Sequence, residues 1–167
     1  MASGKTTLGR ALARRLGWDF VDIDEELERT EGVPAAEIIR SRGEAAFRLA
    51  EAMALKRTVG LRKTVVACGG GTPCFRDNME FMTLHGMTLW LVASPRRIAE
   101  RILEAGDTRP LAAGMEGARL EEFVTGHLHS RQPYYARAQW RLSGEHLETE
   151  SEVEAAVEAF LPQISKS

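Results

Sequence analysis

The first seven residues, Met1-Ala2-Ser3-Gly4-Lys5-Thr6-Thr7, carry the pattern that decides the fold. They match the second half of the phosphate-binding motif G-x-x-x-x-G-K-[ST], in which Gly4, Lys5 and Thr6 occupy the last three positions. In such loops backbone N–H groups and the lysine ammonium bind phosphate oxygens, and the hydroxyl binds a magnesium ion. Because the short form also occurs by chance, the rest of the chain has to support a nucleotide site.

A predicted helix follows this loop directly. Apolar residues recur at three- and four-residue spacing, at Leu8, Ala11, Leu12 and Leu16. That spacing is typical of an amphipathic helix, whose N-terminus would point at the loop. The N–H groups and the dipole at a helix N-terminus favour a bound anion, so this order of elements supports a phosphate site.

Composition excludes several classes of protein. A chain of 167 residues with 44% hydrophobic and 28% charged residues is typical of one soluble globular domain. The formal net charge of −2 creates no positive field for nucleic acid or an anionic membrane. No apolar run approaches the roughly 20 residues of a membrane span, and the N-terminus lacks a secretory signal. We expect a cytoplasmic protein of one domain, residues 1–167, with no nucleic-acid or membrane partner.

The cysteines and histidines do not predict a metal site. The gap between Cys68 and Cys74 matches no common zinc spacing, so we expect two free thiols. His127 and His129 have no cysteine or acidic partner at ligand spacing, and we expect no metal there.

Two aspartates end the first predicted strand, residues 18–23. In Asp22-Ile23-Asp24 the carboxylates stand at i and i+2, so they share a face while the strand lasts and both can lie near the phosphates. The alternative is that Asp24 caps the helix that follows. A carboxylate can cap a helix and act on a ligand at once.

Three helices are predicted between residues 24 and 59. Gly32 ends the first, Pro34 begins the second over residues 35–42, and Gly43 stops it. The third continues to about Val59, and four of its residues are expected on one face: Phe47, Ala50, Met53 and Ala54. Arg48 stands beside that face, where an arginine is ordinarily a solvated side chain.

A second strand, residues 64–68, runs into Gly69-Gly70-Gly71. Consecutive glycines suit a sharp turn or a close ligand, although an ordinary loop tip would also contain them. The next elements are predicted at residues 78–84 (helix), 87–93 (strand), 94–106 (helix), 121–129 (helix) and 139–142 (strand). Thr149 and Glu152 form a capping box for a last helix that ends near Leu161.

Residues 106–119 are rich in glycine and alanine and contain Arg109. A mobile lid that brings an arginine over a phosphate has this composition, and so does an idle surface loop. Arg131 follows the predicted helix 121–129.

Alternation of strands and helices predicts an α/β fold with a largely parallel sheet covered on both faces. Ligands bind beyond the carboxyl ends of such strands. Asp22, Asp24 and residues 69–71 all follow strand ends. We therefore expect them on the same rim as the phosphate loop.

Six segments in this order carry a family resemblance: Gly4-Lys5-Thr6-Thr7, Asp22-x-Asp24, Arg42-Gly43-Glu44-x-x-Phe47-Arg48-x-x-Glu51, Gly69-Gly70-Gly71, Arg109-Pro110-Leu111 and Arg131-x-Pro133-x-Tyr135. Together the segments resemble the shikimate kinases, small P-loop kinases of aromatic amino-acid biosynthesis. The resemblance implies a P-loop NTPase-like three-layer sandwich with a substrate-binding helical region at residues 24–59 and a lid at 106–119. It also implies that ATP phosphorylates the 3-hydroxyl of shikimate, and we expect a monomer.

The resemblance assigns the phosphate side of the site. Gly4, Lys5, Thr6 and Thr7 would bind the nucleotide, with Lys5 on its outer phosphates. Thr6 and Asp22 would hold Mg²⁺, Asp22 through water. Arg109 would close over the transferred phosphoryl group.

On the acceptor side, the resemblance gives Asp24 the shikimate hydroxyl, which it would orient or deprotonate. Arg48 and Arg131 would bind the substrate carboxylate, because guanidinium can donate two parallel charge-assisted hydrogen bonds. The backbone of Gly69, Gly70 and Gly71 would contact the substrate ring.

The chain departs from the family pattern in two places, ahead of Met1 and at residues 143–151. The family has an apolar central strand and the opening glycine of the loop ahead of the position of Met1. Without them we expect two open sheet edges, low stability and weak kinase activity. The basic residue that many members place near adenine is also not evident at residues 143–151.

Two other functions remain open at this stage. Gluconate- and nucleotide-kinase-like enzymes share the phosphate loop and a lid arginine, although Arg48, Arg131 and the triple glycine favour a carboxylated cyclic polyol. A catalytically silent binding relative would also fit an incomplete loop.

Overall fold

The computed structural model describes residues 2–105, 115 and 117–164. Four strands occur where the sequence predicts them: β1 (Asp19–Asp22), β2 (Thr64–Ala67), β3 (Leu89–Val92) and β4 (Trp140–Ser143). The helices are α1 (Lys5–Leu16), α2 (Ile23–Glu31), α3 (Ala35–Lys56), α4 (Asn78–His85), α5 (Pro95–Glu104), α6 (Gly117–Tyr135) and α7 (Glu150–Ile164), with a 3-10 turn η1 (Thr72–Cys74). Among these helices, none is long and apolar enough to cross a lipid bilayer.

The strands form two separate parallel pairs. β1 pairs with β2, with Asp19 opposite Thr64, and β3 pairs with β4, with Leu89 opposite Trp140. The predicted parallel direction is therefore confirmed. The sheet is split in two, because no strand within the described residues joins β2 to β3.

A cavity of about 870 Å³ fills the space between the two pairs. Every residue of β2 and of β3 lines it, whereas β1 and β4 do not. Leu8 of α1 closes one side, and side chains of α4 and α6, among them Met79 and Leu128, close the other. The facing edges of β2 and β3 are the two open edges that the sequence predicts.

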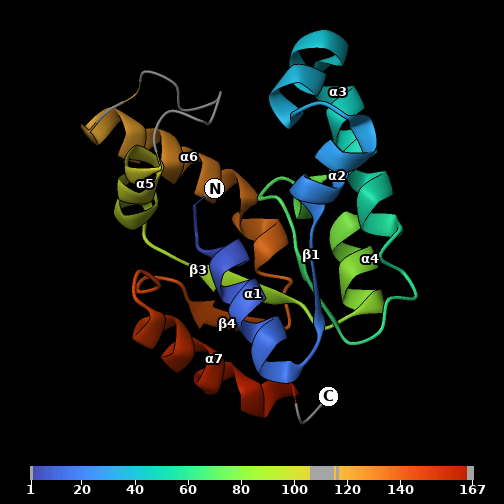
Figure 1. The fold of residues 1–167 in the computed structure, drawn as a ribbon. Coiled ribbons are helices and arrows are strands. Elements are labelled where there is room, and N and C mark those ends of the chain that lie inside the picture. Colours follow the sequence, from blue (N-terminus) through green and yellow to red (C-terminus); the bar gives the residue numbers. More distant parts are fainter. Residues whose placement is uncertain (1, 106–114, 116, 165–167) are drawn as a thin grey trace.

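Helices cover both faces of the strands, as expected for three layers. α1 contacts β1, β2 and α7, and α7 also contacts β4 (Figure 1). Leu8 and Leu12, at the predicted helical spacing, form one buried cluster with Leu91 of β3 and with Val153 and Val157 of α7. This cluster packs the first two turns of α1 against the pair of strands β3 and β4.

Several boundaries differ from the prediction between β1 and the end of α3. β1 ends at Asp22, which caps α2 by accepting a hydrogen bond from the N–H of Asp24. Asp24 thus lies in the first helical turn, so the alternative that it caps α2 is wrong, and the strand in which it would share a face with Asp22 ends before it. Gly32 ends α2 and Gly43 interrupts α3 with a φ of 84°, as predicted. Met53 was expected on the apolar face but is 58% exposed.

The C-terminal helices run further than predicted. α6 begins at Gly117 and continues through Arg131 to Tyr135, because the N–H of Ala136 donates to Gln132 and carries helical bonding past Pro133. α7 extends beyond Leu161 to Ile164. Of the predicted lid, residues 117–119 belong to α6. Arg109 lies outside the described residues.

Candidate active site

Gly4 begins the site at the N-terminus of α1. It adopts a left-handed conformation, with φ 90° and ψ 14°, and its carbonyl accepts the N–H of Leu8 at 2.9 Å. A Cβ at this position would lie 2.6 Å from Cδ1 of Leu147. Both the backbone angle and the close approach therefore require glycine. Lys5 is the first residue of α1, and Thr7 is exposed.

Thr6 and Asp22 meet across the gap between α1 and β1. The Thr6 hydroxyl donates to Oδ2 of Asp22 at 2.8 Å. Oδ1 of the same carboxylate accepts the N–H of Asp24 at 3.0 Å. A hydroxyl and a carboxylate are oxygen ligands of the kind that Mg²⁺ prefers, so this pair fits the predicted metal position.

Asp24 occupies an environment that favours its protonated form. Burial raises the pKa of its carboxyl above the usual 3.8, and the negative charges of Asp22 and Glu51 raise it further. The positive charge of Lys5 acts in the opposite direction, which places that ammonium close to the carboxylate. A carboxylate with a raised pKa is a stronger base than an exposed aspartate.

Gly69 and Gly71 of the triple glycine lie against these side chains without room for a Cβ. One added at Gly69 would lie 2.6 Å from Oε1 of Glu51 and 3.0 Å from Oδ1 of Asp24. One added at Gly71 would lie 2.5 Å from Nη1 of Arg48. The triple glycine is thus a turn packed on charged side chains, and the alternative of an ordinary loop tip is wrong.

Arg48 is held in place, contrary to the interpretation of a solvated side chain. Only 17% of the side chain is exposed, Nη1 donates to Glu51 at 2.9 Å and Nη2 to Glu44 at 3.3 Å. Glu51 is 1% exposed and also accepts the hydroxyl of Thr72 at 2.6 Å. Sequence reasoning gave Glu51 no role, although its i+3 spacing from Arg48 on a helix could have indicated the ion pair.

Arg131 and Tyr135 approach the glycine turn from α6. The Tyr135 hydroxyl donates to the carbonyl of Gly70 at 2.5 Å. Burial raises the pKa of Tyr135, and the nearby charge of Arg131 lowers it in part. Lys5, Gly69, Gly70 and Arg131 all line the cavity, which therefore runs from between the strands to this rim. Sequence reasoning included Tyr135 in a motif but gave it no role.

The thiols are free, as predicted. Burial raises the pKa of Cys68 to about 12, so this thiol stays neutral beside the phosphate end of the site. Within the described residues one group of potential metal ligands occurs, His146, Glu148 and Glu152, and it does not include His127 or His129. Glu148 already pairs with Arg101, and Glu152 caps Thr149.

Comparisons with known proteins agree with this geometry. A family model described as shikimate kinase matches residues 1–163. A shikimate kinase of Bacteroides thetaiotaomicron is 37% identical over 158 residues, covering 95% of this chain and 90% of the relative. One of Parabacteroides distasonis is 37% identical over 153 residues, covering 92% and 88%.

Solved structures are similar over the whole chain. The crystal structure of the shikimate kinase from B. thetaiotaomicron has a TM-score of 0.95 at 36% identity, covering 99% of this chain and 94% of that one. The shikimate kinase of Acinetobacter baumannii in complex with shikimate has a TM-score of 0.85 at 28% identity, covering 100% and 90%. The similarity thus extends from the phosphate loop to α7.

Proposed function

Since the chain belongs to the shikimate kinase family, whose reaction is the ATP-dependent phosphorylation of the 3-hydroxyl of shikimate, we propose how its residues divide that reaction. One observation carries the proposal. The glycine turn brings Asp24 and Arg48, from α2 and α3, to adjacent positions on one rim. A base for a hydroxyl and an anchor for a carboxylate are the two groups that this acceptor requires.

On the nucleotide side, Gly4, Lys5 and Thr7 bind the phosphates, with Lys5 on the outer ones. Thr6 and Asp22 hold Mg²⁺, a role supported by the 2.8 Å distance between their oxygens. When bound, the ion supplies positive charge that neutralises the phosphates. Arg109, from a lid at residues 106–119, provides further positive charge to the transferred group.

On the acceptor side, Asp24 orients the 3-hydroxyl and accepts its proton, a role supported by the raised pKa of its carboxyl. Arg48 and Arg131 bind the carboxylate, and residues 69–71 contact the ring. The substrate region is residues 24–59 within a single domain, residues 1–167. Positioning and charge neutralisation are the main sources of rate in phosphoryl transfer, so no covalent intermediate is required.

We propose that the enzyme acts as a monomer. Two free cysteines are typical of a reducing compartment and support a cytoplasmic location.

The first experiment is a coupled assay of ADP release from ATP with shikimate, gluconate or a nucleoside monophosphate as acceptor. We expect release that depends on shikimate alone. Release with gluconate or the nucleotide would favour the corresponding kinase, and shikimate binding without release would indicate a silent relative. Omission of Mg²⁺ in a parallel assay tests the metal requirement.

A further inference from the structure

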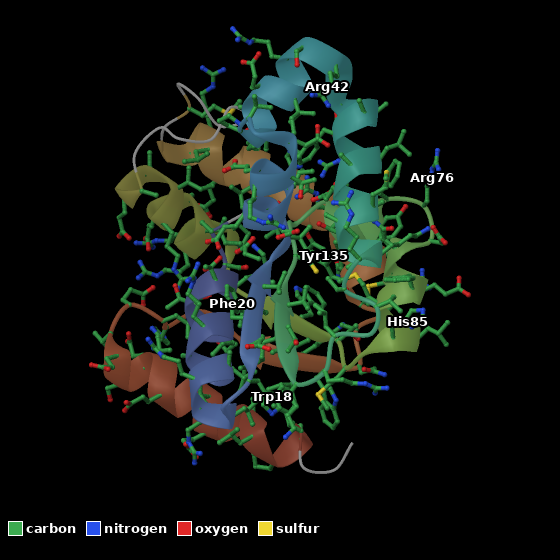
Figure 2. The ribbon with its side chains drawn as sticks, turned by 45° about the vertical axis from the view of Figure 1, so that its right-hand side comes forward. Trp18, Phe20, Arg42, Arg76, His85 and Tyr135 are labelled. Atoms are coloured by element: carbon green, nitrogen blue, oxygen red, sulfur yellow. The ribbon has the colours of Figure 1, made fainter. Side chains whose placement is uncertain are left out.

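Tyr135 connects α6 to the glycine turn. It is the last residue of α6, and its hydroxyl donates to the carbonyl of Gly70 at 2.5 Å. Figure 2 shows Tyr135 at the centre of the molecule, beside the ends of β1 and β2. Its ring packs on Trp90 of β3, with centroids 5.7 Å apart. The ring is thus fixed by a strand while the hydroxyl reaches the turn.

All three carbonyls of the turn accept a local hydrogen bond, and that of Gly70 accepts the Cys74 thiol, at 3.8 Å. The carbonyl of Gly69 accepts the N–H of Thr72, and that of Gly71 accepts the N–H of Cys74, both at 3.0 Å. Within the described residues, the carbonyl of Gly70 is the member of the three that bonds to another helix. The short hydrogen bond from Tyr135 therefore contributes to the orientation of the peptide unit between Gly70 and Gly71, together with the longer one from the Cys74 thiol.

A peptide unit is planar, and its C=O and N–H point in opposite directions. Fixing the Gly70 carbonyl toward α6 therefore directs the N–H of Gly71 away from α6. Gly71 lies against the guanidinium of Arg48, which carries the proposed carboxylate site. We propose that Tyr135 is a positioning residue for shikimate, which holds the N–H of Gly71 toward the substrate at the Arg48 side of the pocket. The inference rests on the proposed function.

Tyr135 is suited to this role at neutral pH. Burial raises the pKa of its hydroxyl, so the group keeps its proton and remains a donor. Arg131 stands one helical turn earlier on α6 and its charge is close to the hydroxyl. The same helix therefore presents a direct anchor for the carboxylate and the residue that orients the turn.

The test compares Tyr135→Phe, which removes only the hydroxyl, with the same change at its neighbour, Tyr134→Phe. Dissociation constants for shikimate and ATP are measured by calorimetry, and the amide signal of Gly71 by NMR of ¹⁵N-labelled protein. For Tyr135→Phe we expect shikimate to bind about tenfold more weakly, within the usual contribution of one hydrogen bond, with ATP binding unchanged. The Gly71 signal should shift, and Tyr134→Phe should behave as the parent.

Equal shikimate affinity and an unshifted Gly71 signal in Tyr135→Phe would overturn the inference. If the parent itself does not bind shikimate, the proposed function fails, and the Gly71 signal still decides the role of Tyr135. If the variant does not fold, hydrogen exchange of the Tyr135 hydroxyl is measured in the parent. Because coupling is reciprocal, added shikimate should slow that exchange, and an unchanged rate would contradict the inference.

Discussion

Asp24 shows how the surroundings of one side chain determine its chemistry. Its raised pKa results from burial and from Asp22 and Glu51, and its predicted task is to take the proton of the acceptor hydroxyl. Asp24→Asn keeps the size of the side chain and removes the base, so turnover should fall by about 10²–10⁴-fold. ATP affinity should stay nearly unchanged. Turnover within about threefold of the parent would show that Asp24 has no such role.

The same substitution should change stability in a pH-dependent way. The folded pKa of Asp24 lies above 3.8, so the folded state binds more protons than the unfolded state between the two pKa values. Its contribution to the free energy of unfolding therefore decreases as pH rises through that window. Asp24→Asn removes this cost, and urea unfolding should show that the stability advantage of the variant grows as pH rises from about 4, until the folded pKa of Asp24 is passed. A pH-independent difference would contradict the assigned environment.

Glu51 and Glu44 orient Arg48 through hydrogen bonds. Its planar guanidinium can then donate two parallel hydrogen bonds to the carboxylate of shikimate. Arg48→Lys keeps the charge but loses the planar pair of donors, so shikimate affinity should fall by about tenfold or more. Quenching of tryptophan fluorescence would report it if Trp18, Trp90 or Trp140 senses binding, and calorimetry provides an independent measure. Equal affinity in the variant and the parent would remove Arg48 from the site.

At the scale of elements, the glycine turn after β2 joins helices α2, α3 and α6 at one rim. Gly71 has a φ of −90°, which any residue can adopt, so the backbone does not require glycine there. A side chain is excluded instead by the guanidinium of Arg48, because a Cβ added at Gly71 would lie 2.5 Å from Nη1. Gly71→Ala should displace Arg48 and weaken shikimate binding by roughly tenfold, with little change in ATP binding. The control is Gly86→Ala, where nothing lies within 4 Å. Equal shikimate affinity in the two variants would contradict the packing of Arg48 on the turn.

At the scale of the whole molecule, the split sheet is the main weakness. β2 and β3 present unpaired N–H and C=O groups to a cavity of about 870 Å³. Open edges and uncovered apolar side chains lower stability and favour aggregation. A strand that pairs with both edges should therefore raise the stability of the molecule.

An N-terminal extension of about ten residues tests this, with five or six apolar residues, then Gly and one further residue ahead of Met1. Such a strand can pair with both β2 and β3, so thermal melts and the coupled assay should show higher stability and turnover. A matched extension with proline in the strand should not, because proline cannot donate to the ladder. If the chain as given melts cooperatively at the same temperature with the same turnover, the cavity does not require a strand.

Residues only a few positions apart were sufficient to predict most helices and strands. Gly32 ends α2 and Gly43 interrupts α3, and Thr149 and Glu152 exchange the predicted capping hydrogen bonds at 2.9 and 3.3 Å. These features depend on residues a few positions apart, whose preferences persist in any packed context. The prediction was less accurate where helices continue past a proline, as at Pro133, because neighbouring hydrogen bonds outweigh one missing donor.

The sequence by itself determined the family, the order of strands and helices and the residue types of the site, because these depend on motifs and short-range periodicity. Only the tertiary structure decided that the Asp24 carboxylate lies near Glu51, that Arg48 packs on Gly71, and that Tyr135 bonds to Gly70 from 65 positions away. It also decided that the parallel strands divide into two pairs around a cavity. Such contacts join residues distant in the chain, and they form only when helices and strands pack together, which no local pattern encodes.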